Sequence, residues 1–253
     1  MTAQETVQKI IADMKKVSTP QRAKISQSFF KTGKGHYGEG DIFIGVTVPE
    51  TRIIAKKYKE TDFNTIKQLL TSEIHEHRLC ALLILVEQMK FAVKKKDEKQ
   101  QAQIFNFLLE HKSRINNWDL VDLSAPQIVG QYLSNTNEGK SSKSEILNKL
   151  AHSQNLWDKR IAIVSTYWFI KQSEFEETFR ITEILIHDTH DLIHKACGWM
   201  LREVGKKDEK ALEQFLSKHV HHMPRTMLRY AIERFNKEKR EFYLNIKRIS
   251  TKE

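Results

Sequence analysis

The sequence predicts an all-α protein, and three observations support that prediction. Apolar residues recur three, four and seven positions apart along most of the chain, which is the spacing of a helix with one buried face. The 253 residues include nine Gly and four Pro, too few for an all-β chain dense in turns. Outside residues 42–48, IFIGVTV, no run of strand-forming residues is convincing, and that run borders a cluster of glycines.

The individual helices follow from this periodicity. The apolar stripe is clearest in residues 73–93, where it includes Leu79, Leu82, Leu83 and Val86. We expect helices at residues 2–17, 20–31, 49–59, 62–71, 73–93, 98–111, 118–132, 141–151, 156–171, 174–187, 191–205, 208–219, 224–235 and 238–246.

Several helix ends carry residues that favour them. An Asn side chain can accept a hydrogen bond from the first turn, so Asn117 and Asn155 are expected to cap the helices that follow them. Thr189 or His190 precedes the helix at 191–205, and Gly205 suits its left-handed end. The polar residues 134–144, SNTNEGKSSKS, predict a linker.

Motif spacing predicts how these helices are arranged. Trp118 and Trp157 are 39 residues apart, as are Arg160 and Trp199. Helix pairs that repeat at about forty residues are typical of HEAT-type solenoids, in which each unit needs its neighbours to bury its apolar face. We therefore expect one domain over residues 1–253, a curved right-handed solenoid (α-α superhelix) of HEAT-like helical repeats, which can act as a monomer.

Charge and composition limit the class of partner. The 42 Lys and Arg outnumber the 32 acidic residues, which gives a formal net charge of +10 and favours an anionic partner, nucleic acid first. A generically basic protein is the plain alternative. No apolar run approaches a membrane span, the N-terminus has no signal-peptide block, and Cys80 and Cys197 lie in apolar helical patterns. These features predict a cytoplasmic, nucleoid-associated protein with buried thiols and no membrane contact.

Four residues are candidates for catalysis: Trp118, Asp122, Arg160 and Trp199. Trp118 and Asp122 are four apart and so share one helix face. Asp122 lies beyond the first turn, where the helix dipole no longer gives a good reason for an acidic residue. The alternative to a catalytic role is a buried carboxylate that pairs with an arginine for structural reasons. Asp119 lies within that turn and needs no other explanation.

The tryptophans differ in what surrounds them. Trp157 and Trp168 are expected in the core, and a core position is also the alternative for Trp199, which is adjacent to Gly198 in the sequence. A glycine inside a helix usually indicates a close approach, here by another helix, a backbone or DNA.

Two further motifs have weaker functional interpretations. GKGHYG at 33–38 matches a dinucleotide-binding pattern formally, but no βαβ unit accompanies it, so we expect a connector. His187, His190 and His194 have spacings that allow a metal site, but the zincin glutamate is missing, and we favour a structural role with no metal and no cofactor.

Basic side chains are the candidates for phosphate contacts, each of which would release counterions. The alternative interpretation is that these side chains are ordinary solvated charges on the protein surface. The expected DNA-binding residues are Lys159, Lys195, Arg202, Arg225 and Arg229.

With these motifs in hand, the chain resembles the DNA alkylation repair proteins of the AlkD type, alkylpurine DNA glycosylases built from HEAT-like repeats. The resemblance covers most of the chain and is carried by FIGVTVPETR, NNWDLVD, LWDKR and KACGWMLREVG. It implies that Trp118, Asp122, Arg160 and Trp199 form the active site. The glycine-rich segment GKGHYGEGD is longer than the resemblance leads us to expect.

The resemblance also implies a reaction. Alkylation of a purine ring nitrogen makes the base cationic, and its departure leaves an oxocarbenium-like sugar that Asp122 would stabilise. The tryptophans would pack against the deoxyribose, and Arg160 would hold a phosphate. The expected partner is double-stranded DNA containing alkylated bases such as 7-methylguanine or 3-methyladenine. The resemblance implies that the damaged base is captured without base flipping and that the protein acts in base excision repair.

Two other classes of function fit the same sequence. One is a non-catalytic binder of branched or distorted DNA on the same solenoid, which would bind junctions tightly without releasing a base. The other is a protein-interaction solenoid, whose partner affinity would be indifferent to charge reversal at the basic residues.

Overall fold

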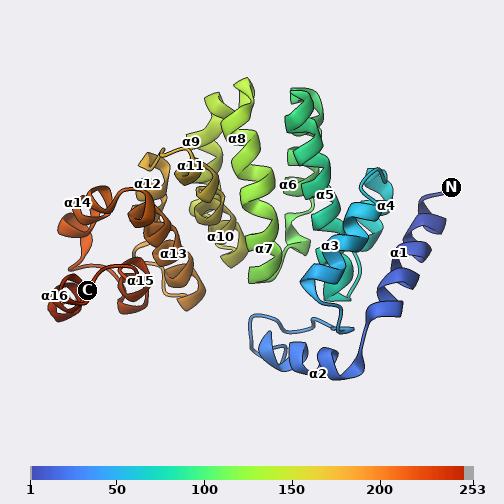
Figure 1. The fold of residues 1–253 in the computed structure, drawn as a ribbon, viewed down its shortest axis with the longest axis horizontal. Coiled ribbons are helices and arrows are strands. Elements are labelled where there is room, and N and C mark those ends of the chain that lie inside the picture. Colours follow the sequence, from blue (N-terminus) through green and yellow to red (C-terminus); the bar gives the residue numbers. More distant parts are fainter. Residues whose placement is uncertain (1, 248–253) are drawn as a thin grey trace. The chain divides into compact units, whose positions relative to one another are not determined.

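The structure is a computed structural model that describes residues 2–247, and throughout this range the regular secondary structure is helical (Figure 1). The all-α prediction is therefore confirmed. Contacts divide the chain into two compact units, with the division between Ile128 and Val129.

The N-terminal unit is organised around its longest helix. Its elements are α1 (Ala3–Val17), α2 (Pro20–Phe29), α3 (Val48–Lys57), α4 (Phe63–Leu70), α5 (His75–Lys95), α6 (Glu98–Glu110), the 3₁₀ turn η1 (Lys112–Arg114), α7 (Trp118–Ala125) and the start of the π-helix η2 (Pro126–Gly130). Helix α5 packs against α3, α4, α6 and α7, and most of its side chains are buried. Because α5 contacts α7 directly, it can position the residues at the start of α7.

Helix α2 is different from its neighbours, because none of its residues is buried. Figure 1 shows it with the long loop that follows it, across one end of the other N-terminal helices. Within that loop the strand-like run that begins at Ile42 forms no strand: the described residues there make only an isolated bridge between Ile42 and Ile74. The Glu76 carboxylate instead accepts hydrogen bonds from the backbone N–H groups of 44–46, which satisfies them without a neighbouring strand.

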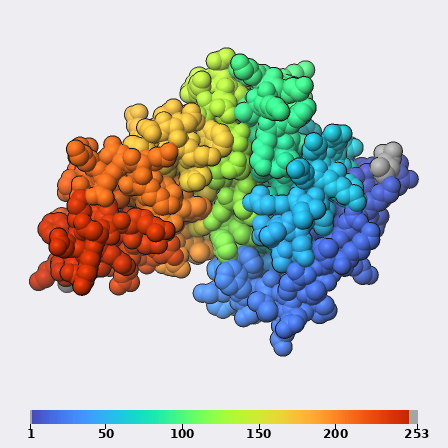
Figure 2. All heavy atoms as spheres, viewed as in Figure 1, coloured from blue at the N-terminus to red at the C-terminus, as the bar shows by residue number. Residues whose placement is uncertain are grey.

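The C-terminal unit is organised around α13. Its elements are α8 (Gln131–Asn135), α9 (Asn137–Ala151), α10 (Leu156–Ser165), α11 (Tyr167–Lys171), α12 (Glu176–Leu185), α13 (Asp191–Lys207), α14 (Glu209–His219), α15 (Arg225–Ala231) and α16 (Lys237–Asn245). Helix α13 packs against α10, α11, α12, α14 and α15. The space-filling view shows the surface of α14 to α16, in the red part of the colour scale (Figure 2).

Local signals predicted several helix starts correctly. The Asn117 side chain accepts from the Trp118 backbone N–H at 2.8 Å, and Asn155 accepts from those of Trp157 and Asp158. Of the two residues proposed to precede α13, the structure selects His190, whose ring accepts from the Leu192 N–H at 3.1 Å. The buried position of both cysteines is also confirmed.

Two predictions about helix ends are wrong. Residues 134–144 are not a linker, because α9 already begins at Asn137, where Thr136 caps it by accepting from the Gly139 N–H. Gly205 does not end α13, which continues to Lys207. A Cβ at Gly205 would lie 2.5 Å from Leu212 Cδ2, so this glycine permits close packing of α14 against α13.

Gly198 also marks a close approach, and the structure identifies its partner. A Cβ at this position would lie 2.5 Å from the Met227 carbonyl oxygen and from Tyr230 Cβ, both in α15. The sequence left three possible partners for this close approach: another helix, a backbone or DNA. The structure shows that it is a helix–helix contact.

The expected core tryptophans behave differently. Trp157 is buried, whereas Trp168 is half-buried. In the described part of the chain, no helix has the length and apolar content needed to cross a membrane.

Candidate functional site

Trp118, the first residue of α7, is held by other aromatic side chains. Its ring stacks on Phe30 with centroids 5.2 Å apart and planes at 17°, and it meets Phe29 edge-on at 5.9 Å. Its indole N–H donates a hydrogen bond to the Tyr37 hydroxyl at 3.3 Å. The glycine-rich loop that the sequence predicted as a plain connector thus supplies a direct contact to the candidate tryptophan.

A buried charged network lies at the start of the same helix. His75 donates from Nδ1 to Asp41 at 3.0 Å and from Nε2 to Asp119 at 2.8 Å, and its side chain is 1% exposed. Arg78 and Asn117 also donate to Asp41, the latter at 2.9 Å. We call these five residues the His75 network. Because it contains both the cap of α7 and the acid of its first turn, it fixes that turn to α5.

The protonation of the network follows from its contacts. Burial alone would lower the pKa of His75, but its hydrogen bonds to Asp119 and Asp41 outweigh burial and raise that pKa to about 9. Burial would raise the pKa of Asp41, yet hydrogen bonding from His75 and the Arg78 charge lower it. At neutral pH His75 is therefore an imidazolium between two carboxylates, which accounts for both of its ring nitrogens acting as donors.

The network and the aromatic cluster are physically connected. The His75 ring stacks on Phe43 at 4.4 Å, Phe43 stacks on Phe30 at 4.8 Å, and Phe30 stacks on Trp118. Trp118 is thus held both through its ring and through its helix start, which fixes its orientation before any ligand binds.

Asp122 lies one turn further along α7 and is half-buried. Its spacing of four from Trp118 places both side chains on one face of a helix whose first turn is anchored. Trp118 and Asp122 therefore share one face of α7.

Asp119 requires a correction to the sequence interpretation. The helix dipole was considered sufficient to explain this acid, but the side chain is buried and paired with His75. A solvated acid in the first turn gains little from the dipole, whereas a buried acid needs a partner. Asp119 is therefore part of the structure that holds Trp118.

In the C-terminal unit, Trp199 is half-buried on α13, with the Tyr167 ring 6.3 Å away at 34°. Arg160 on α10 is only 5% exposed, and it donates to the Leu192 carbonyl at 2.6 Å, in the first turn of α13. The guanidinium that was expected to hold a phosphate is therefore buried in this structure and bonded to the protein backbone. Arg160 lies on the face of α10 that packs against α13, the helix that carries Trp199.

Three of the expected phosphate-binding residues form ion pairs within the protein. Lys159 pairs with Asp188 at 2.7 Å and Lys195 pairs with Asp191 at 2.7 Å. Arg202 pairs with Glu233 across to α15. The first of these pairs is mostly shielded from solvent, so Lys159 would have to exchange a good partner to reach a phosphate.

The other two expected phosphate-binding residues differ in exposure. Arg225 is half-buried and donates to the carbonyls of Leu244 and Ile246, so it joins α15 to the end of α16. Arg229 is exposed one turn later on the same helix. Of this group, Arg229 is the residue most accessible to DNA.

The histidine motif has structural contacts. His190 caps α13, and the His194 ring donates to the Asp188 carbonyl at 2.5 Å. Within the described residues, no group of three or more His, Cys, Asp or Glu side chains is arranged to hold a metal ion.

Sequence reasoning missed His75, Asp41 and the aromatic residues Phe30 and Tyr37. Their contacts join positions 30–43, 75 and 117–119, which are far apart along the chain. Of these residues, only Asp41 could be noticed in the sequence, as a carboxylate beside an apolar run. Its position does not indicate which side chain it would pair with.

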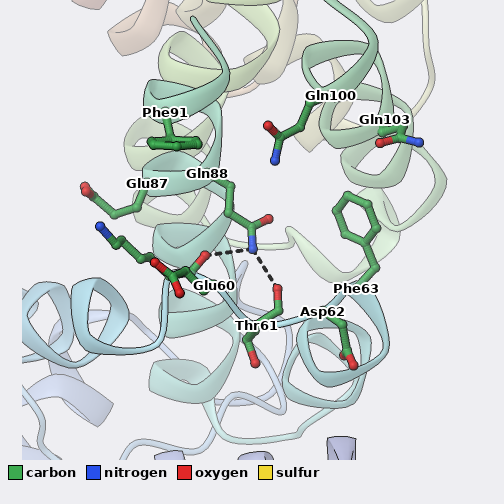
Figure 3. A pocket seen from close by; sticks show the side chains of 10 residues that line it. Glu60, Thr61, Asp62, Phe63, Glu87, Gln88, Phe91, Gln100 and Gln103 are labelled. Atoms are coloured by element: carbon green, nitrogen blue, oxygen red, sulfur yellow. Dashed lines mark hydrogen bonds between the residues drawn. The ribbon is translucent and has the colours of Figure 1, made fainter. Parts of the chain in front are cut away.

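A separate pocket of about 400 Å³ lies in the N-terminal unit (Figure 3). It is lined by the loop before α4 and by α5 and α6, and Gln88 donates to the Lys59 and Thr61 carbonyls at its floor. Its lining includes none of the predicted site residues, and the carboxylates of Glu60 and Glu87 do not suit a polyanion. The start of α7 is therefore the better candidate site.

Comparisons with known proteins place the chain in a family and support its fold. A family model described as DNA alkylation repair enzyme matches residues 10–235. Among solved structures, the chain is similar to a predicted DNA alkylation repair enzyme from Enterococcus faecalis, with a TM-score of 0.65 and 15% sequence identity, over 87% of this chain and 97% of that one. That likeness supports a shared helical-repeat fold. No curated protein matches the chain.

Proposed function

Because the chain belongs to the DNA alkylation repair enzyme family, we propose that it is a DNA glycosylase that hydrolyses the N-glycosidic bond of cationic alkylated purines in duplex DNA. The observation that supports this most is the pair Trp118 and Asp122 on one face of α7, whose start is fixed by the buried His75 network. A carboxylate and an indole on one face of a helix whose start is fixed suit electrostatic stabilisation of a sugar cation.

The proposed reaction uses the charge already present on the damaged base. The bond between C1′ and the purine nitrogen breaks, its electron pair goes to the purine, and the leaving base becomes neutral. The sugar becomes oxocarbenium-like, and the Asp122 carboxylate stabilises it. Water then adds to C1′ and loses a proton, which Asp122 accepts or relays, leaving an abasic site.

The tryptophans supply a surface for the damaged nucleotide. An indole face close to a developing cation contributes about 0.5–2 kcal/mol. Trp118 is fixed by stacking on Phe30, so it offers that face without reorganisation. We assign Trp199 the same role from the C-terminal unit. Arg160 holds the first turn of the helix that carries Trp199, through the Leu192 carbonyl.

The predicted site residues lie outside the pocket of Figure 3, which is consistent with capture of the lesion in or near the base stack rather than in an extrahelical pocket. A glycosylase that captures the lesion in this way selects its substrate by the cationic character of the base rather than by contacts to the base edge. We therefore expect 7-methylguanine and 3-methyladenine to be released, and neutral bases such as uracil to be retained.

The test is base release from methylated duplex DNA by the full chain. Free 7-methylguanine and 3-methyladenine, with an equal yield of abasic sites, would support the proposal. A uracil-containing duplex serves as the neutral control. Tight binding of distorted or branched DNA with no base released would reject the enzyme and favour the non-catalytic DNA binder.

A further inference from the structure

The pocket of Figure 3 is built entirely within the N-terminal unit and is lined by none of the residues of the proposed active site. Its volume of about 400 Å³ is in the range of sites that hold small organic ligands. Three segments surround it: the loop before α4, one face of α5 and the first half of α6. Helix α5 packs against both α4 and α6, so the walls are held by the core of one compact unit.

Two phenylalanine rings form walls of this pocket. Figure 3 shows Phe91 of α5 on one side of the space and Phe63, the first residue of α4, on the other. Phe91 is 52% exposed, and the Lys95 ammonium lies 5.4 Å from the centre of its ring, so this ring already attracts a positive charge. Phe63 stacks on Phe107 at 4.7 Å, which holds its ring in place before any ligand binds. Two such rings suit a flat ligand.

Glutamine side chains supply polar contacts inside the pocket. The Gln88 amide nitrogen donates to the Lys59 carbonyl at 2.9 Å and to the Thr61 carbonyl at 2.7 Å, which uses both of its hydrogens. These bonds fix the amide and leave its oxygen as an acceptor at the floor of the pocket (Figure 3). The Gln100 amide points into the same space from α6. A ligand that fits this floor therefore has N–H donors at its edge.

The charges of the lining indicate a cation. The whole chain has a net charge of +10, yet three of the ten lining residues are acidic, Glu60, Asp62 and Glu87, and one, Lys59, is basic. Glu87 pairs with Lys90 at 2.6 Å, and Asp62 caps α4 by accepting from its first turn. Glu60 is exposed at the same pocket. Carboxylates in these positions attract a positive ligand and repel a phosphate.

We propose that this pocket binds a flat organic cation that carries N–H donors and no phosphate, such as a purine nucleoside methylated on a ring nitrogen. Its ring lies between Phe63 and Phe91, its amino group donates to the Gln88 oxygen, and Glu60 balances its charge. The site shares no residue with the proposed function, so either can fail without the other.

The experiment is a calorimetric titration of the full chain at pH 6 with 1-methyladenosine, a flat cation with an amino group. Three comparison ligands each change one property. N6-methyladenosine has the same atoms apart from the added proton and is neutral, spermidine is cationic but not flat, and 1-methyladenosine 5′-monophosphate adds a phosphate. We expect 1-methyladenosine to bind about tenfold more tightly than each of the three, the scale of one cation–π contact.

Two variants test the walls of the pocket, and each has a matched control. Phe91→Ser should weaken binding of 1-methyladenosine about tenfold, whereas Phe242→Ser, at a position 63% exposed on α16, should not change it. Glu60→Gln should weaken it about threefold, as for an exposed charge pair. Its control is Glu110→Gln, at an exposed position of the same unit outside the lining. All four positions are exposed, so thermal unfolding, measured alongside, should change little.

The outcomes separate this site from the proposed active site. Failure of the wild type to bind 1-methyladenosine, equal binding of N6-methyladenosine or spermidine, or an equal loss in a control variant would reject the pocket. Asp122→Asn should bind 1-methyladenosine as the wild type does; a loss there, with none in Phe91→Ser, would place the ligand at the proposed active site and also reject the pocket. Phe91→Ser should release 7-methylguanine at the wild-type rate. A wild type that binds 1-methyladenosine through Phe91 but releases no base would reject the glycosylase alone.

Discussion

The two compact units hold their candidate tryptophans by different physical means. In the N-terminal unit, Trp118 follows a helix cap that belongs to a buried network of charges around His75. In the C-terminal unit, Trp199 lies on a helix that is held against α15 by close backbone contact at Gly198, with Arg160 bonded to its first turn. The support of Trp118 depends on the protonation of His75, whereas the support of Trp199 depends on how closely α13 and α15 pack.

This difference matters because the two kinds of support fail under different conditions. A buried ion network is strongly destabilised when one partner is removed, and it responds to pH. A close helix–helix contact responds to added volume and is insensitive to pH. The comparison can therefore be tested by changing one kind of support at a time.

The largest effect is expected for Asp41→Ala. This change removes the carboxylate that accepts from His75, Arg78 and Asn117, and leaves the buried Arg78 guanidinium without the carboxylate that balances its charge. Breaking a buried pair costs about 3–5 kcal/mol, measured by urea unfolding of the full chain. Asp13→Ala is the control, since it removes two ion pairs, with Lys16 and Lys57, at the surface of the same unit. A loss no larger than that of the control would mean that the network does not support the fold.

Stability should also depend on pH through His75. A raised folded-state pKa means that the folded protein retains the proton more tightly, so its contribution is complete below about pH 6.5 and is lost as pH rises through about 9. At about 1.4 kcal/mol per pKa unit, this shift corresponds to about 3 kcal/mol. Urea unfolding at pH 6 and pH 9.5 measures it. In His75→Gln this pH-dependent step should disappear, and its persistence would assign it to other groups.

A smaller effect is expected for Gly198→Ala in the C-terminal unit. The added methyl group would overlap the Met227 carbonyl and Tyr230, and overpacking of this kind costs about 1–3 kcal/mol. The loss should be the same at pH 6 and pH 9.5, unlike that of the network. Gly33→Ala is the control, because its Cβ would meet only His36 at 3.4 Å. A pH-dependent loss at Gly198 would contradict the comparison.

The smallest effect is expected for Tyr37→Phe. It removes the hydroxyl that accepts from the Trp118 indole, a contact worth about 0.5–1.5 kcal/mol. Base release should fall modestly while thermal unfolding changes little, because the stack on Phe30 remains. A complete loss of release would show that the hydroxyl itself takes part in the chemistry.

The sequence predicted those parts of the fold that depend on local chemistry. Asn117 and Asn155 cap helices because the cap needs only an acceptor beside the first turn. The prediction from the sequence was wrong at residues 134–144, where the polar composition suggested a linker. There Thr136 caps α9, and Ser141 and Ser142 donate to the Glu138 carbonyl, so a polar segment forms a helix.

The candidate site was predictable to the same extent. The spacing of Trp118 and Asp122 gave their shared face, because that follows from helix geometry alone. The pairing of His75 with Asp41 and Asp119 was not predictable, since it joins residues that are 34 and 44 positions apart. The burial of Arg160 depends likewise on which face of α10 meets α13.

The central claim is that the Asp122 carboxylate stabilises the sugar cation, and its most direct test is single-turnover release of 7-methylguanine by Asp122→Asn at saturating protein. Asparagine keeps the shape of the side chain and removes its charge. We predict that the variant binds methylated duplex as the wild type does and releases the base about 100-fold more slowly, the scale of a lost electrostatic contact of about 3 kcal/mol. Release at the wild-type rate would contradict the claim.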